Sequence, residues 1–380
     1  MLKVACGMVS HGIAIGAAKS TILRSAASQM LEDQFMGVYE VDPLQDQRWN
    51  ALVQGHAHGS VFHSPGWLEA LRTTYGYDPV VISTCAPNET LTNGLVFCRV
   101  RSWLTGHRMV SVPFSDHCEP LVNNADELHC LLSTLKHRVD DGEWKYIEIR
   151  PVTLRPSSRS GLTQSLTYEF HRLDLRKSKQ VLFRGFHKDC VQRKIRRAER
   201  EKLQYEEGTS EDLLQKFYRL LVMTRRRQYL PPQPLSWFRG LIAAFGTDLK
   251  IRVASKDGVA VASILTLSHK KTMVYKYGCS NLAFNNLGGT ALLFWNAIQE
   301  ATDNGLEELE MGRSDVDNFG LIAFKEHWGA SGTRISYWTY PHSGTGLPSV
   351  WKKKLARYLV PAVPDLALRT VGRLLYKHIG

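Results

Sequence analysis

The sequence has 380 residues, of which 43% are hydrophobic and 22% are charged, so it is long enough to bury two ordinary domain cores. It holds no run of about 18 apolar residues, which argues against a membrane-spanning helix. Its seven scattered cysteines form no C-x-x-C pair, which argues against a disulfide scaffold or a zinc site and for a reducing compartment.

The balance of charge is basic. The chain carries 48 Lys and Arg against 36 Asp and Glu, a formal net charge of +12. We therefore expect an anionic partner.

The first 35 residues carry little sign of structure. Met1 to Leu31 has no acidic residue and only three cations, and Ser10 and His11 break its apolar stretch, so it is a poor signal peptide. We expect 1–35 to be a disordered tail, or the start of translation to lie near Met36.

The next part, 36–175, has the pattern of an α/β domain. Apolar alternation predicts strands at 79–84, 94–103 and 107–112, a helix around 125–139 and a strand at 145–149. Asp116 and His117 follow the third strand and are candidate substrate contacts. His117 and Cys118 are adjacent, and neighbours on an extended chain point to opposite sides, so we expect neither zinc binding nor thiol catalysis there.

A basic segment follows the first domain. Residues 172–202 contain twelve Lys or Arg against four Asp or Glu, a local net charge of +8. Val191, Ile195 and Ala198 share one helical face and arginines occupy the rest, which predicts an amphipathic basic helix. It suits CoA phosphates, a nucleotide- or lipid-linked pyrophosphate, a tRNA backbone or an anionic membrane; the alternative is a solvated face balanced by nearby glutamates.

A second helix is predicted over 211–228, and three prolines stop it. Its last turn holds an arginine cluster that includes Arg226. This cluster suits a phosphate or carboxylate of the substrate, or it is a favourable charge at a helix C-terminus.

The second domain, 176–345, repeats the order of elements of the first. Strands are predicted at 249–254, 259–267 and 271–277, a helix from about Gly288 to Gly305, and a strand at 306–311. An Asp257-Gly258 turn joins the first two strands. We predict tandem α/β (α+β) domains, each a mixed, mostly antiparallel sheet flanked by helices.

The start of the helix near Gly288 is the candidate cofactor site. Its unpaired N–H groups and its missing side chains suit a phosphate, which makes Asn286, Gly288, Gly289 and Thr290 the candidate cradle. The alternative is that the two glycines only let the helix pack closely against the sheet.

Motifs along the chain resemble the FemAB-like branch of the GNAT superfamily. The most specific is MGRSDVDNFGLIAFKEHWGA from Met311; FHSPGWLEAL from Phe62, HRMVSVPFSDHCEPL from His107, YIEIRP from Tyr146 and RKIRRAER from Arg193 support it. The resemblance covers about residues 60 to 340. It implies a tandem GNAT fold and transfer of an acyl group to an amine.

The resemblance leaves two donors open. Asn285 to Thr290 fits the acetyl-CoA loop of ordinary GNAT enzymes at one of three defining positions. Acetyl-CoA or another acyl-CoA is the expected co-substrate and aminoacyl-tRNA the alternative, with no metal. The absence of a long helical insertion in the second domain favours the smaller donor.

Direct transfer requires no nucleophile on the protein. The candidate catalytic residues are Arg313, Ser314 and Asp315, with Asp315 as the most plausible base; the alternative is that Arg313 and Asp315 form an ion pair that pins a loop. The candidate substrate contacts in this half are Lys325, Tyr275 and Tyr277.

The last segment, 346–380, interleaves cations with apolar side chains. It is expected either to lie on an anionic membrane or to dock on the domain.

We predict a cytoplasmic enzyme, with contact to the inner face of the membrane as an option. Its acceptor would be an amine-bearing envelope or exopolysaccharide precursor. It would bind no DNA, and tRNA only as the alternative donor. A non-catalytic basic adaptor for RNA or anionic lipid is the alternative of another class.

Overall fold

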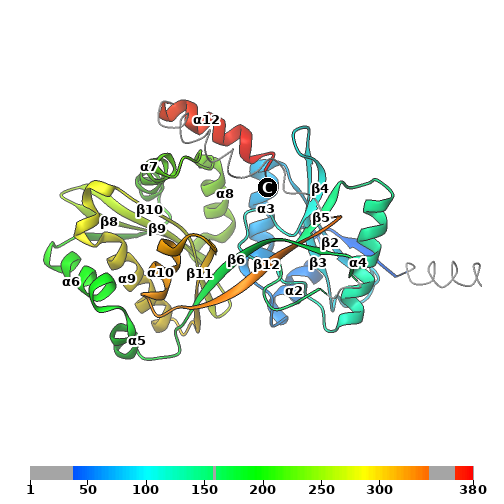
Figure 1. The fold of residues 1–380 in the computed structure, drawn as a ribbon, viewed down its shortest axis with the longest axis horizontal. Coiled ribbons are helices and arrows are strands. Elements are labelled where there is room, and N and C mark those ends of the chain that lie inside the picture. Colours follow the sequence, from blue (N-terminus) through cyan, green and yellow to red (C-terminus); the bar gives the residue numbers. More distant parts are fainter. Residues whose placement is uncertain (1–36, 157–159, 342–363, 380) are drawn as a thin grey trace, which may run out of the picture.

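The computed structural model describes residues 37–156, 160–341 and 364–379. Twelve strands form one continuous sheet in the order β1-β2-β3-β4-β5-β12-β6-β11-β10-β9-β8-β7, with helices packed on its faces (Figure 1). The predicted α/β class with two successive halves is confirmed, and the two sheets are joined edge to edge.

The first half follows the predicted order. Its main elements are β1 (Tyr39–Val41), α2 (Gln47–Gly55), α3 (Pro65–Tyr75), β2 (Asp78–Ser83), β3 (Leu95–Ser102), β4 (Gly106–Val110), α4 (Ala125–Asp140) and β5 (Tyr146–Ile149). Strands β2, β3 and β4 are antiparallel, and β5 runs parallel to β4. The parallel pair is possible because α4 carries the chain back across the sheet.

The second half repeats this order. Its elements are α5 (Lys179–Gly185), a π-helical turn η3 (Lys188–Gln192), α6 (Arg193–Arg200), β7 (Gln204–Gly208), α7 (Glu211–Arg227), α8 (Leu235–Phe245), β8 (Leu249–Lys256), β9 (Val259–His269), β10 (Thr272–Ser280), α9 (Gly289–Asp303), β11 (Glu308–Asp315) and α10 (Phe319–Glu326). Asp257 and Gly258 both have positive φ, as the predicted two-residue hairpin turn requires.

Two long strands join the halves. They are β6 (Thr163–Asp174) and β12 (Ser331–Tyr340), and they pair with each other in antiparallel fashion. β12 also pairs with β5 of the first half, while β6 pairs with β11 of the second. β12, the last strand among the described residues, therefore extends the sheet of the first half, a crossover that the sequence pattern did not predict.

The halves also share a hydrophobic core. One cluster of buried side chains runs from α3 of the first half to α7 and α8 of the second, with Trp67 and Trp237 in edge contact at 5.2 Å. A second cluster lies under α9, and a third lies under α4. Buried apolar side chains therefore pack across the junction between the halves.

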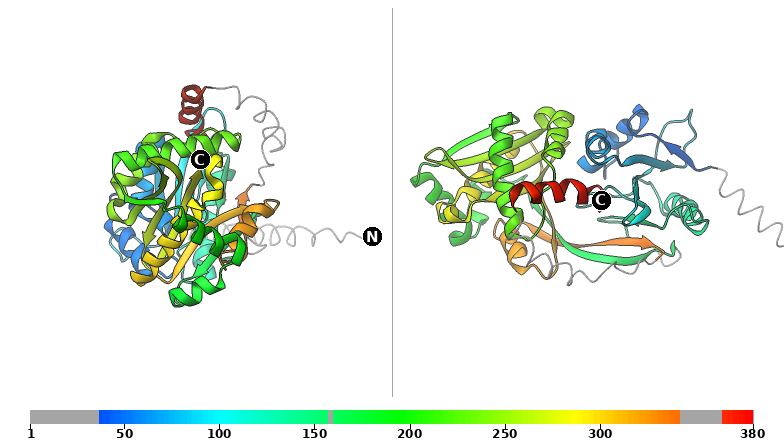
Figure 2. Two further views of the ribbon diagram at one scale, coloured as in Figure 1. Left: turned by 90° about the vertical axis from the view of Figure 1, so that its left-hand side faces the viewer. Right: turned by 90° about the horizontal axis from the view of Figure 1, so that it is seen from above.

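The helix α12 (Asp365–Tyr376) lies across the junction, as the view from above shows (Figure 2). The Tyr77 hydroxyl of the first half donates to the backbone oxygen of Tyr376, and the Tyr376 hydroxyl donates to the backbone oxygen of Pro231 in the second. For 364–379 the structure shows the docked alternative. The predictions for 1–35 and 346–363 fall outside the described residues. No helix in the described ranges is long and apolar enough to cross a bilayer.

Candidate functional site

Strands β10 and β11 are hydrogen-bonded only near their start. Their parallel pairing joins Thr272, Met273 and Val274 to the stretch that begins at Glu308, although β10 continues to Ser280 and β11 to Asp315. β11 meanwhile stays paired with β6 on its other side. The two strands therefore part and open a wedge in the sheet, which we call the β10–β11 wedge.

A β-bulge places a lysine at this wedge. Tyr275 pairs with Thr266 and Tyr277 pairs with Leu265, so Lys276 is an extra residue in β10. A bulge turns its extra residue out of the ladder. The Lys276 ammonium lies over the rings of Phe62 and Trp67, at 5.1 and 5.7 Å from their centroids.

The same bulge decides where the two predicted tyrosines lie. Tyr275 packs on Phe294 of α9, and Tyr277 is buried in the core, where its hydroxyl accepts a hydrogen bond of 2.9 Å from Trp237 Nε1. Both serve packing in this structure. Lys276, which lies between them and was not among the predicted site residues, is the residue of β10 whose polar side chain lies in the wedge.

Asp116 reaches the wedge from the other half of the protein. Its loop follows β4, and its carboxylate accepts a hydrogen bond of 2.7 Å from Lys276 Nζ. Arg313 Nε of β11 lies 3.9 Å from the other carboxylate oxygen. One carboxylate thus stands between two cations from the two sides of the wedge.

Tyrosines hold Arg313 in place. Its guanidinium donates to the Tyr337 hydroxyl at 2.7 Å and lies over the Tyr168 ring at 4.2 Å from the centroid. The Tyr337 hydroxyl donates in turn to the backbone oxygen of Asp116 at 2.8 Å. The Arg313 side chain is 31% exposed, so solvent reaches the cluster at Arg313.

The charges of the cluster shift each other's protonation. Burial alone would raise the pKa of the Asp116 carboxyl, but Lys276 and Arg313 outweigh it and hold that pKa below its ordinary value. Burial lowers the pKa of the Lys276 ammonium, and the charges of Arg313 and Arg150 add to this against the attraction of Asp116. Asp116 is therefore a carboxylate, while Lys276 loses its proton more readily than a free lysine.

Lys325 lies next to this cluster rather than at the surface. It projects from α10, is 1% exposed, and donates a hydrogen bond of 2.6 Å to the backbone oxygen of Gly312. Burial lowers the pKa of its ammonium to about 8. Gly312 has a φ of 70°, and a Cβ there would lie 3.4 Å from the Asp116 carboxylate, so glycine lets β11 bend around the cluster.

His117 forms a separate buried pair. Its Nε2 lies 3.1 Å from the carboxylate of Glu310 on β11, and the two side chains are almost fully buried. Burial alone would raise the pKa of Glu310, but the charge and hydrogen bond of His117 hold it below its ordinary value. Cys118 points to His63 instead, at 3.3 Å, and burial raises the pKa of its thiol to about 12, so it is no thiolate nucleophile.

The other two residues of the predicted catalytic group lie apart from the Asp116 carboxylate. Ser314 is 2% exposed, and its hydroxyl has no hydrogen-bond partner among the described residues. Asp315 is exposed at the end of β11, where its backbone oxygen accepts a hydrogen bond from Asn318. The alternative that Arg313 pairs with Asp315 is not seen, because Arg313 contacts Asp116 instead.

The two glycines at the start of α9 are required for packing. Gly288 has a φ of 80°, and a Cβ on it would lie 2.2 Å from the backbone oxygen of Lys194 in α6. A Cβ on Gly289 would lie 3.0 Å from a methyl of Val261. Asn286 is exposed and Thr290 is half-buried, whereas Gly288 and Gly289 are buried, so solvent reaches the predicted cradle at Asn286 and Thr290.

The basic helix α6 forms as predicted and covers this helix start. Ile195 and Ala198 are buried, while Arg193, Lys194, Arg196, Arg197 and Arg200 are exposed. Arg226, in contrast, forms an ion pair with Asp365 of α12, which gives it a structural role in the docked helix. The exposed cations beside the start of α9 are those of α6.

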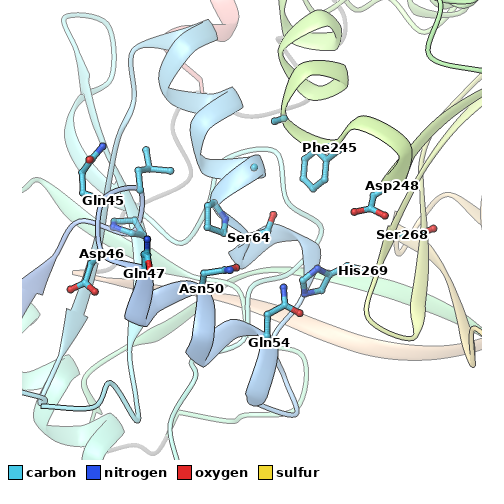
Figure 3. Close-up of a pocket in the computed structure, with 15 residues that line it drawn as sticks. Gln45, Asp46, Gln47, Asn50, Gln54, Ser64, Phe245, Asp248, Ser268 and His269 are labelled. Atoms are coloured by element: carbon cyan, nitrogen blue, oxygen red, sulfur yellow. The ribbon is translucent and has the colours of Figure 1, made fainter.

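A cavity of about 340 Å³ lies between the two halves (Figure 3). Asn50, Gln54 and Ser64 line it from the first half, and Asp248 and His269 line it from the second. A second cavity of about 400 Å³ shares Gln54 and His269 with it. The segment that runs from Phe62 to Trp67 lines the first cavity with its middle residues and contacts Lys276 with its two end residues.

Residues 187–325 match the family model described as acetyltransferase (GNAT) domain. This match covers the π-helical turn η3, α6, the glycines at the start of α9, the β10–β11 wedge and Lys325. The sequence matches no curated protein.

The fold is similar to that of several solved structures. The crystal structure of FemX has a TM-score of 0.63 and 15% identity, over 80% of this chain and 97% of that chain. The C-terminal domain of a putative lysylphosphatidylglycerol synthetase from Agrobacterium fabrum has a TM-score of 0.50 and 14% identity, over 83% and 94%. A tandem GNAT protein from the clavulanic acid biosynthesis pathway has a TM-score of 0.50 and 12% identity, over 81% and 99%.

Proposed function

The chain is a GNAT-superfamily protein with a FemAB-like tandem fold, and we propose that it transfers an acyl group, from acyl-CoA, to an amino group of a cell-envelope or exopolysaccharide precursor. The observation that carries this proposal is the cluster of Asp116, Lys276 and Arg313 in the β10–β11 wedge of the GNAT domain. Its cations stand where two strands separate, and Arg313 opens it to solvent.

The proposed reaction is a direct transfer. The acceptor nitrogen attacks the acyl carbonyl, the new C–N bond forms, the C–S bond of the thioester breaks, and CoA leaves as a thiol after it takes up a proton. The carbonyl oxygen carries negative charge in the tetrahedral intermediate, and Lys276 and Arg313 are the donors that would stabilise it. Asp116 orients both cations.

The excess of positive charge also favours an uncharged acceptor amine. Lys276 already has a lowered pKa because it is buried beside Arg313 and Arg150. The same field would lower the pKa of an ammonium that enters the wedge, so the amine would arrive as a nucleophile. The proton that it loses on attack would pass to Asp315, which is exposed at the end of β11.

The donor would bind on the accessible side of the start of α9, next to α6. Asn286 and Thr290 border this place, and the exposed cations of α6 match the phosphates of CoA. Aminoacyl-tRNA is the second candidate donor. The close cover of Gly288 by Lys194 narrows the room for a pyrophosphate at the helix start, while the exposed row of cations suits a longer phosphate backbone.

The acceptor and its location are proposed from the cavity and from α12. Amides, hydroxyls, two carboxylates and a histidine line the cavity between the halves together with apolar residues, and the Phe62 to Trp67 segment connects it to Lys276, so it suits the polar part of a sugar or peptide precursor. Trp103 is 85% exposed, and the exposed Leu366 and Leu374 of α12 neighbour cations such as Arg373. This surface would hold a cytoplasmic enzyme at an anionic membrane.

Calorimetric titration of the full chain with acetyl-CoA tests the donor. We expect micromolar binding that weakens at least about tenfold when Arg193 and Lys194 are both changed to Glu, since two attractive charges become repulsive. The matched control changes Arg176 and Lys177 to Glu, which alters the net charge equally outside α6. If acetyl-CoA does not bind and aminoacyl-tRNA binds tightly and in a salt-sensitive way, acyl-CoA is excluded as the donor and aminoacyl-tRNA is favoured.

A further inference from the structure

A second cluster of chemically reactive side chains lies away from the wedge cluster, on the outer side of α10. His187, Cys190 and His327 each offer one ligand atom, and these atoms lie within 4.8 Å of one another. The His187 and His327 rings are 4.4 Å apart between centroids. Two imidazoles and a thiol at this spacing form a donor set for a metal ion.

Local structure brings the three together from two segments. His187 and Cys190 belong to the tight corner between α5 and α6, where His187 precedes η3 and Cys190 lies within it. His327 ends α10. The backbone N–H of His187 donates to the backbone oxygen of His327 at 2.8 Å, which fixes one segment against the other. The cluster is therefore held by main-chain contacts and not by the side chains alone.

We propose that His187, Cys190 and His327 bind a divalent metal ion, with zinc as the best match. Nitrogen and thiolate donors favour zinc over calcium or magnesium, which take oxygen ligands. Ligand atoms in a tetrahedral zinc site lie roughly 3.5 Å apart, so small side-chain rotations close the site. The ion displaces the thiol proton of Cys190, which is released to solvent, and the sulfur–metal bond forms in its place.

The surroundings leave room for a fourth ligand. Cys190 and His327 are half-buried, whereas His187 is exposed. Among the described residues no carboxylate joins the three ligand atoms, so a water molecule would complete the coordination. The Nδ1 atom of His187 also accepts a hydrogen bond of 3.2 Å from the Cys190 N–H. A metal ion would either displace this hydrogen bond by binding Nδ1 or leave it intact by binding Nε2.

Bound metal would couple this corner to the catalytic half. Lys325 precedes His327 by two residues and donates to Gly312 in the wedge, and Trp328 packs against Phe186 and Phe294 in the core. The same corner leads into α6, which covers the start of α9. A metal that joins α10 to this corner would thus stabilise the positions of Lys325 and of the basic helix.

Cobalt and zinc titrations of the full chain, stripped of metal by a chelator, test the proposal. We expect stoichiometric Co²⁺ binding with a thiolate-to-cobalt charge-transfer absorption, displaced by Zn²⁺ in a competition assay. C190S should lose that absorption, and both C190S and H327Q should weaken Zn²⁺ binding by at least about 100-fold, more than the loss of an outer-shell contact. C130S, at a half-buried cysteine on α4, should keep the wild-type behaviour.

Stability measurements separate metal binding from a folding defect. Zn²⁺ should raise the melting temperature of the wild type and of C130S but not of C190S, and the metal-free proteins should melt alike. The proposal is overturned if the wild type binds cobalt without a thiolate band, if it binds no zinc at micromolar concentration, or if C190S retains the wild-type affinity.

Discussion

Asp116 and Lys276 are 160 residues apart in the chain, and their side chains meet at 2.7 Å in the wedge between β10 and β11. The carboxylate comes from the first half of the protein and the ammonium from the second. Neither half holds the pair alone, so the tandem arrangement builds the charged site as well as the fold.

The change D116N tests this pairing. Replacing the carboxylate by an amide keeps the shape of the side chain but leaves the buried Lys276 and the partly exposed Arg313 without their anion. We expect a loss of about 3 kcal/mol of unfolding free energy, the usual cost of removing one partner of a buried pair. Urea unfolding of both proteins at neutral pH measures it.

D315N is the matched control for D116N. Asp315 is also a carboxylate beside Arg313 in the chain, but it is exposed, so its amide should change stability by no more than about 0.5 kcal/mol. A strong effect on turnover with little effect on stability would identify Asp315 as the base. Equal destabilisation by D116N and D315N would contradict the assignment of the buried pair.

Lys325 predicts a pH dependence of stability. Its folded pKa is about 8 against an ordinary value of 10.5, so between these values the unfolded chain holds a proton that the folded chain has released. The unfolding free energy contributed by this group therefore rises with pH from about 8 to 10.5. K325M should remove that rise. It should not lower the unfolding free energy at pH 7, because burying methionine carries no cost for desolvating a charge.

The exposed Lys188 supplies the control for Lys325. K188M should retain the wild-type rise of stability between these pH values, measured by urea unfolding at several pH values. A K325M protein with the same pH slope as the wild type would show that Lys325 titrates normally.

The packing of α9 on α6 predicts the effect of a single methyl group. G288A places a Cβ 2.2 Å from the backbone oxygen of Lys194 at a positive φ, so we expect a loss of about 1–3 kcal/mol. G320A in α10 meets no atom within 4 Å and should be neutral or slightly stabilising. If both variants unfold at the same urea concentration as the wild type, the backbone of Lys194 does not lie in close contact with Gly288.

The sequence predicted the repeated order of elements well because apolar alternation and helical spacing are local signals. The strand at 145–149, the helix from Gly288 and the Asp257-Gly258 turn lie where those signals placed them. The crossover of β6 and β12 was missed, since pairing between strands distant in the chain leaves no local pattern.

The candidate site was predicted in part for the same reason. Arg313 was selected as a catalytic candidate and Asp116 as a substrate contact, while Asp315 was predicted to be the base. The bulge that places Lys276 at the wedge, and not Tyr275 or Tyr277, is a register shift between β9 and β10. The one sign of it was a lysine within an otherwise apolar and aromatic strand.

The exposed apolar face of α12 predicts membrane binding. L374E places a negative charge on a side chain that is 61% exposed beside basic residues, so it should reduce sedimentation with anionic lipid vesicles several-fold. V259E makes the same change on a 50% exposed valine in the β8–β9 hairpin and should have little effect. Binding that is equal in the two variants would contradict a membrane-facing α12.

The release of free CoA thiol on mixing acetyl-CoA, the full chain and a panel of amino sugars and precursor peptides tests the central claim most directly. We predict release with at least one acceptor, a fall of about 100-fold in R313A, which removes an oxyanion donor, and no change in R334A, which alters an exposed arginine on β12. Release at the wild-type rate by R313A, or transfer from aminoacyl-tRNA where no acceptor reacts with acetyl-CoA, would contradict it.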